Sequence, residues 1–327
     1  MKARATASPN IALVKYWGKR DSQLKLPLND SISVTLAGDF QSRTTVEFSE
    51  DYAQDSLLLD GVEASEKEMQ NSFLVLDYLR KLAAVDFRAS VVSQNTFPKG
   101  VGIASSSSGY AALAAAASAA LGLKPDARQL SIAARLGSGS ASRSIIGGFA
   151  HWKAGSMDDG SDSFAVQIAD ENHWPELRIV TAITSAEPKI IGSTEGMKRT
   201  VETSALFRQR LSTIPAKVEG IRQAILGKNM HSLLPAVMAE SNSLHAVMLD
   251  SWPPIIYLND TSKRIIAAVH ELNDASGEII AGYTFDAGPN AHILTEQKYL
   301  HEVEKAIKGE GVKSLHVSRP GEGSRIL

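Results

Sequence analysis

Hydrophobic and polar positions alternate with a period of two in several short segments of the first half of the chain. Residues 32–36 and 44–48 show this alternation, which predicts half-buried strands. Residues 11–14 form a continuous apolar run after a Pro-Asn break, which predicts a buried strand leading into a basic loop. Asp60-Gly61 predicts a hairpin-type turn. Further strands are expected over residues 87–92, 145–152, 164–168 and 177–184.

Helical periodicity appears first over residues 66–83, where apolar side chains recur three or four positions apart. An alanine-rich run that ends at Leu121 also favours a helix. Beyond about residue 185 long helical segments dominate, which places a soft domain boundary there and predicts domains over residues 1–185 and 186–327. Further helices are expected over residues 125–136, 195–211, 216–226, 230–249, 260–272 and 296–308, with strands over residues 279–285 and 315–317.

The bulk composition is that of an ordinary globular protein. The 327 residues allow one large or two ordinary domains, and the hydrophobic fraction of 43% and the charged fraction of 21% are typical. Lys and Arg number 34 against 36 Asp and Glu, so no basic excess indicates nucleic acid or an anionic membrane as the main partner. Any charge that binds phosphate must therefore be local.

The chain contains no cysteine. This excludes disulfides, thiolate nucleophiles and cysteine-ligated metals, and it fits a reducing cytosol. The first residues lack the apolar segment of a signal peptide. Residues 101–123 carry no charge and are about long enough to span a bilayer, but their serines, glycines and alanines are too weakly apolar. We therefore expect a cytoplasmic protein without a membrane segment.

A loop of small residues precedes the alanine-rich run. Residues 97–109 contain three glycines and four consecutive serines. A flexible loop that opens a helix offers backbone N–H groups, hydroxyls and the positive end of the helix dipole, which together bind anions such as phosphate. No Lys-Ser or Lys-Thr follows the last glycine, so this is not a Walker loop. The alternative is a buried alanine-rich helix with a Gly/Ser entry turn.

Two further segments combine cations with small or aromatic residues. Residues 15–20 carry three cations, a glycine and two aromatic side chains, which favours a held loop that binds an anion. Solvated surface charge is the alternative. Residues 137–144 form a second Gly/Ser turn with one arginine, Arg143, and its hydroxyls, amides and guanidinium could clamp a phosphate or a carboxylate. The alternative there is a flexible loop with an outward arginine.

One carboxylate stands at the end of an apolar strand. Asp286 comes directly before a turn that Gly288 and Pro289 force. An aspartate in that position is often only an acceptor within the turn, and a catalytic aspartate held on a rigid element is the functional alternative. The eight histidines form no metal-binding pair such as HxH or HExxH, so we expect no metal site made of protein ligands. Phosphoryl transfer needs little more than two Gly/Ser loops, a basic segment and one carboxylate, because its catalysis is mostly positioning and charge stabilisation.

The Gly/Ser loop over residues 98–109 resembles the nucleotide loop of the GHMP small-molecule kinases, the family of galactokinase, homoserine kinase and mevalonate kinase. The resemblance narrows to one branch, mevalonate diphosphate decarboxylase. The long strings ASPNIALVKYWGKR at 7–20 and YTFDAGPNA at 283–291 are far more specific than the serine loop. The motifs run in the family's order and cover nearly the whole chain, at residues 7–20, 137–143, 193–197, 250–254, 259–262 and 283–291.

The resemblance implies an α+β fold of the GHMP-kinase type. The N-terminal ATP-binding domain would be similar to domain 2 of ribosomal protein S5, the C-terminal domain would be ferredoxin-like, and the active site would lie in the cleft between them. The implied reaction is the decarboxylation of mevalonate 5-diphosphate in the mevalonate pathway of isoprenoid biosynthesis. ATP with Mg²⁺ phosphorylates the tertiary 3-hydroxyl, and phosphate and CO₂ then leave to give isopentenyl diphosphate. A homodimer is implied as well, because homodimers are usual in the family.

The resemblance also implies roles for individual residues. Asp286 would orient the 3-hydroxyl or take its proton, and would stabilise the positive charge that builds at C3. Arg143 would hold the substrate carboxylate, Lys15 would organise the transferred phosphate or Asp286, and Asn10 would hold its neighbours in position. The substrate diphosphate would be bound by Tyr16, Lys19, Ser138, Ser140 and Ser193. The ATP phosphates would be bound by the loop residues Pro98, Gly102, Ser105, Ser106 and Ser107. Mg²⁺ would be held largely by those phosphates and a hydroxyl.

Two positions depart from the family pattern. The family's cysteine next to the arginine is Ser142 here, and Thr194 stands where some members carry an arginine. The second change leaves the decarboxylation of mevalonate 5-phosphate as an alternative activity. A GHMP kinase that phosphorylates without decarboxylating is more distant, because Asp286, Lys15 and Arg143 argue against it. A non-catalytic protein that binds a phosphorylated metabolite would keep the loops and show no turnover.

Overall fold

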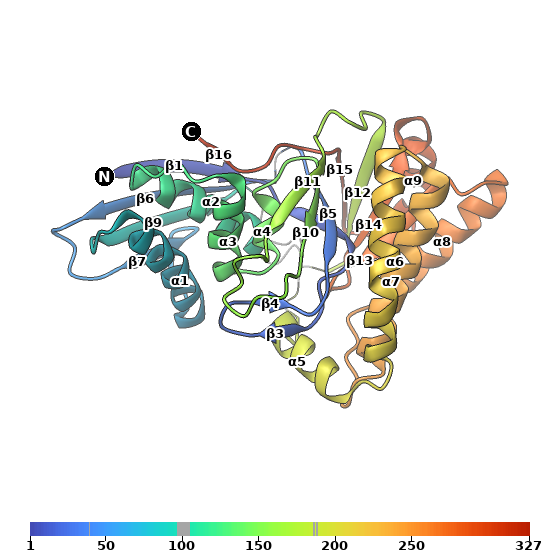
Figure 1. The fold of residues 1–327 in the computed structure, drawn as a ribbon. Coiled ribbons are helices and arrows are strands. Elements are labelled where there is room, and N and C mark those ends of the chain that lie inside the picture. The colour runs from blue at the N-terminus through green and yellow to red at the C-terminus, as the bar shows by residue number, and fades with distance from the viewer. Residues whose placement is uncertain (39, 97–104, 186, 188) are drawn as a thin grey trace.

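The computed structural model describes residues 1–38, 40–96, 105–185, 187 and 189–327, and of Ser105 it describes the backbone alone. Helices and mostly antiparallel strands are mixed along the chain. Figure 1 shows the N-terminal elements on one side of the molecule and the long helices α6, α7 and α8 on the other. Within these described ranges, no helix combines the length and the apolar character that crossing a membrane requires.

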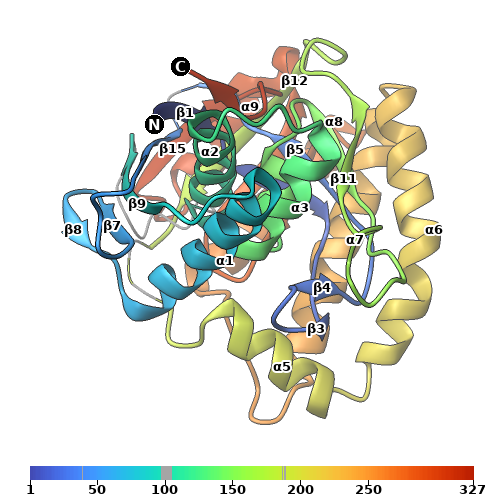
Figure 2. The same ribbon diagram turned by 60° about the vertical axis from the view of Figure 1, so that its left-hand side comes forward.

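A six-stranded sheet and a layer of helices form the outer part of the N-terminal half. The strands, in spatial order, are β16 (Arg325–Ile326), β1 (Lys2–Ala7), β6 (Ser42–Ser49), β9 (Arg88–Asn95), β7 (Ser56–Leu59) and β8 (Val62–Glu63). The helices are α1 (Glu66–Ala83), α2 (Ser105–Ala120), α3 (Ala127–Gly137) and α4 (Ala141–Ser144). The alanines of α2 are mostly fully buried against β1 and β6, and their small side chains let the helix lie close to the sheet. α1, α2 and α3 lie side by side (Figure 2).

A second sheet lies in the middle of the molecule. Its strands, in spatial order, are β11 (Ala165–Ala169), β10 (Phe149–Trp152), β5 (Ser31–Thr35) and β2 (Asn10–Val14), and a small ribbon of β3 (Lys19–Asp21) and β4 (Leu26–Pro27) follows β2. The apolar run of β2 is fully buried, as predicted. Ile11 and Leu13 of β2 share a core with Ile221 and Leu233 of the C-terminal helices. This core fixes β2, and with it the basic segment that follows.

The C-terminal half contains a third sheet and most of the helices. The strands are β13 (Ala281–Phe285), β14 (Ala291–Glu296), β12 (Leu177–Ile183) and β15 (Ser314–Ser318), in spatial order. The helices are α5 (Ser193–Thr203), α6 (Phe207–Leu226), α7 (Met230–Leu249), α8 (Asp260–Ser276), the 3₁₀ helix η1 (Gln297–Tyr299) and α9 (Leu300–Lys308). β12 pairs with β14 and β15 in this third sheet, whereas β16, at the end of the chain, pairs with β1 in the six-stranded sheet. The chain therefore passes from the N-terminal half to the C-terminal half and returns at its end. The domain boundary near residue 185 stays a proposal.

Several predicted elements have the predicted bounds because their ends are set locally. α1 begins with a capping box in which the Ser65 hydroxyl accepts from the Glu68 N–H and the Glu68 carboxylate accepts from the Ser65 N–H. α7 also has the expected bounds. Asp60 and Gly61, with φ of 53° and 82°, form the turn between β7 and β8.

The expected division of the helices between residues 195 and 226 is wrong. Instead of a break before Ala216, the chain breaks at Ser204, and Pro215 lies inside α6. The Ser204 hydroxyl donates to Asp250 Oδ2 at 2.7 Å, and the same oxygen accepts from the Leu206 N–H at 3.0 Å. These contacts stabilise the turn between α5 and α6. Pro215 has no N–H and removes one backbone hydrogen bond from α6, but the helix continues through it.

Two strand expectations also need correction. The strand expected over residues 145–152 begins only at Phe149, because Gly148 has a φ of 67°, outside the range of a strand. A Cβ at Gly148 would lie 2.3 Å from the Ala169 carbonyl oxygen. β5 is fully buried rather than half-buried. Its polar face does not face solvent. Ser31 accepts a hydrogen bond from Arg143 of α4, and Thr35 donates to the carbonyl of Ile146, shortly after α4.

Candidate active site

Lys15 and Asp286 are 271 positions apart in the chain and form an ion pair in the structure. Lys15 directly follows β2 and Asp286 directly follows β13, so two different sheets bring the pair together. Lys15 Nζ lies 2.7 Å from Asp286 Oδ1. The Lys15 side chain is 2% exposed, whereas the Asp286 side chain is 35% exposed. The carboxylate is therefore the member of the pair that a ligand can reach.

Burial and charge act in opposite directions on this pair. Burial lowers the pKa of the Lys15 ammonium and outweighs Asp286, which raises it. Burial by itself would raise the pKa of the Asp286 carboxyl, but the charge of Lys15, with smaller effects of His292 and Arg143, outweighs it and the pKa is lowered. Asp286 is thus held as a carboxylate, the form that can accept a proton or stabilise a positive charge.

Arg143 in α4 belongs to the same site. Burial lowers the pKa of its guanidinium to about 10, and the nearby Asp286 acts in the opposite direction. Arg143 Nε donates to Asn10 Oδ1 at 3.1 Å, and Nη1 donates to Ser31 Oγ at 2.7 Å. Asn10 Nδ2 in turn donates to Ser144 Oγ at 2.7 Å. No described residue accepts a hydrogen bond from Arg143 Nη2, so that edge of a firmly held guanidinium is available to bind a carboxylate.

Two of the segments expected to bind a diphosphate meet at Tyr16. The Tyr16 ring packs edge-on against Trp152, with ring centroids 4.8 Å apart, and its buried hydroxyl has no partner among the described residues. The hydroxyls of Ser138 and Ser140 lie 3.3 Å apart. Gly139 lets this turn come close, because a Cβ there would lie 2.8 Å from the rings of both Tyr16 and Trp152. An unpartnered phenol beside two neighbouring hydroxyls suits phosphate oxygens.

Lys19 and Ser193 approach each other from β3 and α5. Lys19 Nζ lies 3.5 Å from Oγ1 of Thr194, the residue after Ser193 at the start of α5. Lys189, which sequence analysis did not single out, donates to Ser193 Oγ at 3.3 Å and to the Ala287 carbonyl at 2.8 Å. Lys189 therefore links the start of α5 to the turn that contains Asp286. Its sequence signal is its place shortly before the motif at 193–197.

The serine loop is described only in part. Pro98 and Gly102 lie outside the described residues, and Ser105 is described only as the first backbone position of α2. Ser106 is exposed at this helix start, and Ser107 is buried. The N-terminus of α2 thus lies where the loop ends, an arrangement that presents backbone N–H groups to a phosphate.

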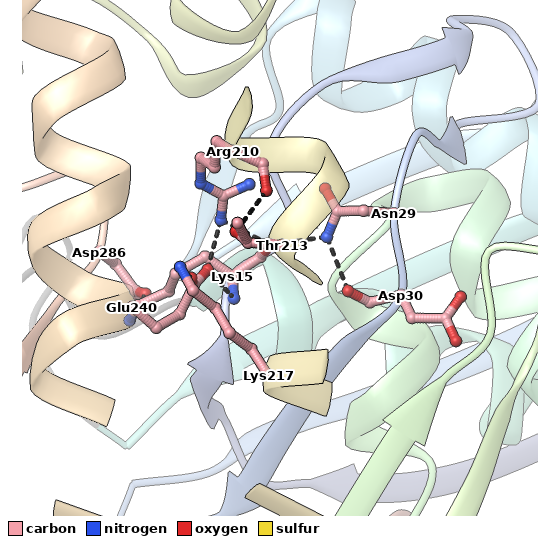
Figure 3. Close-up of polar contacts among 8 residues, drawn as sticks. All are labelled: Lys15, Asn29, Asp30, Arg210, Thr213, Lys217, Glu240 and Asp286. Atoms are coloured by element: carbon pink, nitrogen blue, oxygen red, sulfur yellow. Dashed lines mark hydrogen bonds and ion pairs between the residues drawn. The ribbon is translucent and has the colours of Figure 1, made fainter. Parts of the chain in front are cut away.

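Three buried polar residues near Lys15 were also missed by sequence analysis. Glu240 of α7 and Arg210 of α6 pair with each other, and both contact the Lys15 backbone (Figure 3). His292 of β14 is 1% exposed, and burial lowers its pKa to about 4. These residues lie in ordinary helix and strand patterns, so no local motif marks them.

A mixed fold of helices and mostly antiparallel strands, with separate N- and C-terminal parts, is the fold of the GHMP small-molecule kinases and their relatives. Residues 7–165 match the diphosphomevalonate decarboxylase-like N-terminal domain. Residues 179–316 match the mevalonate 5-diphosphate decarboxylase C-terminal domain. The chain belongs to the diphosphomevalonate decarboxylase family.

Similar proteins agree with this assignment. The diphosphomevalonate decarboxylase of Aspergillus fumigatus is 43% identical over 324 residues, which cover 94% of this chain and 80% of the relative. A crystal structure of mevalonate diphosphate decarboxylase from Staphylococcus aureus has a TM-score of 0.93 and 36% identity, and covers 100% of this chain and 98% of that chain. A structure described as MDDEF in complex with MVAPP, AMPPCP and magnesium has a TM-score of 0.91 and 37% identity, covering 100% and 99%. The family, fold class and decarboxylase class that the motifs predict are thereby confirmed.

Proposed function

We propose that this chain catalyses the ATP-dependent decarboxylation of mevalonate 5-diphosphate to isopentenyl diphosphate, with release of ADP, phosphate and CO₂. The observation that carries the proposal is the Lys15–Asp286 pair beside Arg143. These groups put a carboxylate that can accept a proton and a guanidinium that can bind a carboxylate into one site. The similarity to diphosphomevalonate decarboxylases over nearly the whole chain supports the same activity.

In the first step, the 3-hydroxyl oxygen forms a bond to the γ-phosphorus of ATP and ADP leaves. Asp286 accepts a hydrogen bond from the hydroxyl, orients it and takes its proton. Lys15, 2.7 Å from Asp286, adds positive charge beside the transferred phosphoryl group. The lowered pKa of Asp286 favours loss of that proton to solvent, which restores the carboxylate before the second step.

In the second step, the C3–O bond breaks and phosphate leaves with the electron pair. The C1–C2 bond then breaks, its electrons form the C2–C3 double bond, and CO₂ is released. Asp286 stabilises the positive charge that develops at C3, and Arg143 holds the carboxylate beside that carbon. Tyr16, Lys19 and the serines at 138, 140 and 193 are our proposed ligands of the 5-diphosphate.

We further propose that ATP binds at the loop that opens α2 and that Mg²⁺ binds together with ATP. The described ranges hold no group of three or more His, Asp or Glu side chains placed to bind a metal ion. The ATP phosphates would therefore supply most of the magnesium ligands, and the bound ion would neutralise phosphate charge. The homodimer and the cytoplasmic location stay predictions.

The two phosphorylated mevalonates should be separated clearly by their kcat/KM values. We expect the 5-diphosphate to be preferred by roughly 10- to 100-fold, because the monophosphate loses at least one charge-assisted hydrogen bond of about 1.5–3 kcal/mol. A coupled assay that follows ADP and CO₂ with each substrate measures the ratio. Release of ADP without CO₂ from both substrates would make the protein a kinase and contradict the proposal.

The decarboxylation of mevalonate 5-phosphate is the second candidate function. It is favoured by Thr194, a neutral residue at a position where some family members carry an arginine. Lys19 Nζ lies 3.5 Å from Thr194 Oγ1. The same assay decides between the two, since a large preference for the monophosphate would establish the second candidate.

The Asn10→Ala variant is expected to lose about 1–3 kcal/mol of unfolding free energy, because it leaves Arg143 Nε and the Ser144 hydroxyl without a buried partner. Its kcat/KM should fall as well, since Arg143 loses one of the two contacts that orient its guanidinium. Urea unfolding and the ADP and CO₂ assay measure the two effects.

Asn273→Ala is the matched control for this variant. Asn273 is also buried and makes three hydrogen bonds, to the backbone of Ile280 and Ala281. We expect it to lose similar stability while the folded enzyme keeps its turnover. Equal turnover of the two folded variants would show that Asn10 has no role beyond stability.

A further inference from the structure

A buried carboxylate that takes no part in the proposed chemistry contacts the backbone of Lys15. Glu240 lies within α7 and is fully buried. Its Oε1 accepts from the Lys15 N–H at 3.2 Å and from Arg210 Nη2, and its Oε2 accepts from Lys217 Nζ at 2.7 Å. Figure 3 shows these side chains around Lys15, on the two helices α6 and α7 that pack beside β2.

Both polar atoms of the Lys15 main chain are held by side chains instead of by the sheet. β2 ends at Val14, and its pairing with β5 is irregular just before this point. The Lys15 N–H donates to Glu240, and the Lys15 carbonyl accepts from Asn29 Nδ2 at 3.0 Å and from Arg210 Nη2 at 3.4 Å. A buried peptide group outside the sheet needs such partners. The contacts fix the point of the backbone from which Nζ reaches Asp286.

The charges of this cluster are a poor means of stabilising the fold. The Arg210 and Glu240 side chains are 1% and 0% exposed. Burying such a pair costs a desolvation energy about as large as the energy that the attraction between the two charges returns. A protein with an apolar pair of similar volume in its place is often as stable. Arg210 Nε and Nη1 are also buried without a partner among the described residues. An apolar pair, however, could not make the hydrogen bonds to the Lys15 backbone that Glu240 and Arg210 make.

We propose that Glu240, together with Arg210, is a positioning residue for the reaction, which holds the Lys15 main chain so that Nζ meets Asp286 and which places a negative charge near the Lys15 ammonium. The inference rests on the proposed function, in which Lys15 acts as a cation beside the transferred phosphoryl group. Glu240 acts through Lys15 and touches no substrate atom.

Charged and titratable groups surround Lys15 on several elements. They are Asp286 after β13, His292 in β14, Glu240 and His245 in α7, Arg210 and Lys217 in α6, and Arg143 in α4. Burial lowers the pKa of Lys15, Asp286 and then Glu240 raise it, and Arg143 lowers it. The two histidines stay neutral, because burial lowers each pKa to about 4. Loss of the Glu240 charge would therefore lower the pKa of Lys15 further, so that Lys15 would lose its proton at a lower pH.

The Glu240→Gln variant tests the proposal, because it removes the charge and keeps both the shape and an acceptor for the Lys15 N–H. We expect kcat to fall roughly 10- to 100-fold, with a smaller change in KM, since Lys15 is no longer held in place as a cation. The alkaline limb of the kcat–pH profile should move to lower pH. Lys217→Met should move this limb in the opposite direction, because it leaves more of the Glu240 charge unneutralised.

Glu219→Gln is the matched control. Glu219 is an exposed carboxylate on α6 that pairs with Arg222 and Gln223, so its loss should change neither kcat nor the limb. A purely structural role for Glu240 predicts a less stable Glu240→Gln variant whose folded molecules keep the wild-type limb, and that result would overturn the proposal. If Glu240→Gln does not fold, the double variant with Arg210→Met, which removes the whole buried pair, takes its place in the same comparison.

A second measurement does not depend on turnover. The carbon-13 resonance of Lys15 Cε, assigned by its loss in Lys15→Met, reports the protonation of Lys15 directly. We expect its titration to move to lower pH in Glu240→Gln. A wild-type protein that releases no CO₂ would refute the proposed function, whereas an unchanged Lys15 titration in the variant would refute the role of Glu240.

Discussion

Asp286→Asn is expected to lower kcat by about 10²- to 10⁴-fold, with a much smaller change in the KM for mevalonate 5-diphosphate. Asparagine keeps the size of the side chain and can still accept a hydrogen bond. It cannot take the proton of the 3-hydroxyl, and it carries no charge to stabilise the cation at C3. Rates of ADP and CO₂ release at saturating ATP measure the loss.

Asp55→Asn is the matched control for this variant. The Asp55 side chain is 8% exposed and pairs with Arg80, much as Asp286 pairs with Lys15. Each variant removes the charge of a carboxylate that pairs with a buried cation, although Arg80 keeps its second ion pair, with Asp77. Both variants should therefore unfold at a lower temperature, but only Asp286→Asn should lose turnover. Wild-type turnover of Asp286→Asn would contradict the catalytic role. Absence of turnover in the wild-type protein would instead indicate a non-catalytic protein that binds a phosphorylated metabolite.

Local sequence patterns predict an element well when that element determines its own ends. α1 has its predicted bounds because Ser65 and Glu68 cap each other within the segment. The break between α5 and α6 depends on Ser204 and Asp250, which lie 46 positions apart, and no local pattern contains that contact. β5 is similar, because its polar face is covered by Arg143, 112 positions away from Ser31.

The site shows the same limit. By residue pattern alone, Lys15 could be surface charge, Asp286 a turn acceptor and Arg143 an outward side chain, and only the resemblance to a family joined them. Glu240 could not be found in either way, because its contact with Lys15 spans 225 positions and its helix has an ordinary apolar stripe. A sequence pattern does not reveal which polar positions other elements will cover, and those are the positions where a charge has its largest effect.

Arg143→Gln is expected to slow CO₂ release by about 10²- to 10³-fold, and to slow phosphoryl transfer less. The guanidinium is held at Nε and Nη1 and is left with Nη2 for the substrate carboxylate, whereas glutamine has no such second edge. Phosphoryl transfer keeps Lys15, Asp286 and the loop before α2. Until CO₂ leaves, the C3 cation can take phosphate back, so slower loss of CO₂ should let the 3-phosphorylated intermediate accumulate. Rapid-quench single turnovers with ATP labelled at the γ-phosphate would detect labelled organic phosphate before free phosphate.

Arg135→Gln separates this effect from the loss of any buried arginine. Arg135 is 1% exposed, and its described hydrogen bonds go to the carbonyl oxygens of Leu24, Gly160 and Ser163. Its loss should lower stability while the folded enzyme releases CO₂ at the wild-type rate. Equal slowing of both steps in Arg143→Gln, with no intermediate, would assign Arg143 to substrate binding as a whole.

The 3-phosphorylated intermediate is expected to accumulate because of how the charge of the substrate carboxylate changes during decarboxylation. The carboxylate loses its negative charge as it becomes CO₂, so an arginine that only bound it tightly would oppose the reaction. Because Asn10 and Ser31 already fix two nitrogen atoms of Arg143, the guanidinium can keep the C1–C2 bond aligned with the empty orbital at C3 while Asp286 stabilises the charge there. Orientation by Arg143 and charge stabilisation by Asp286 are thus separate contributions, and only the loss of orientation should leave a phosphorylated intermediate behind.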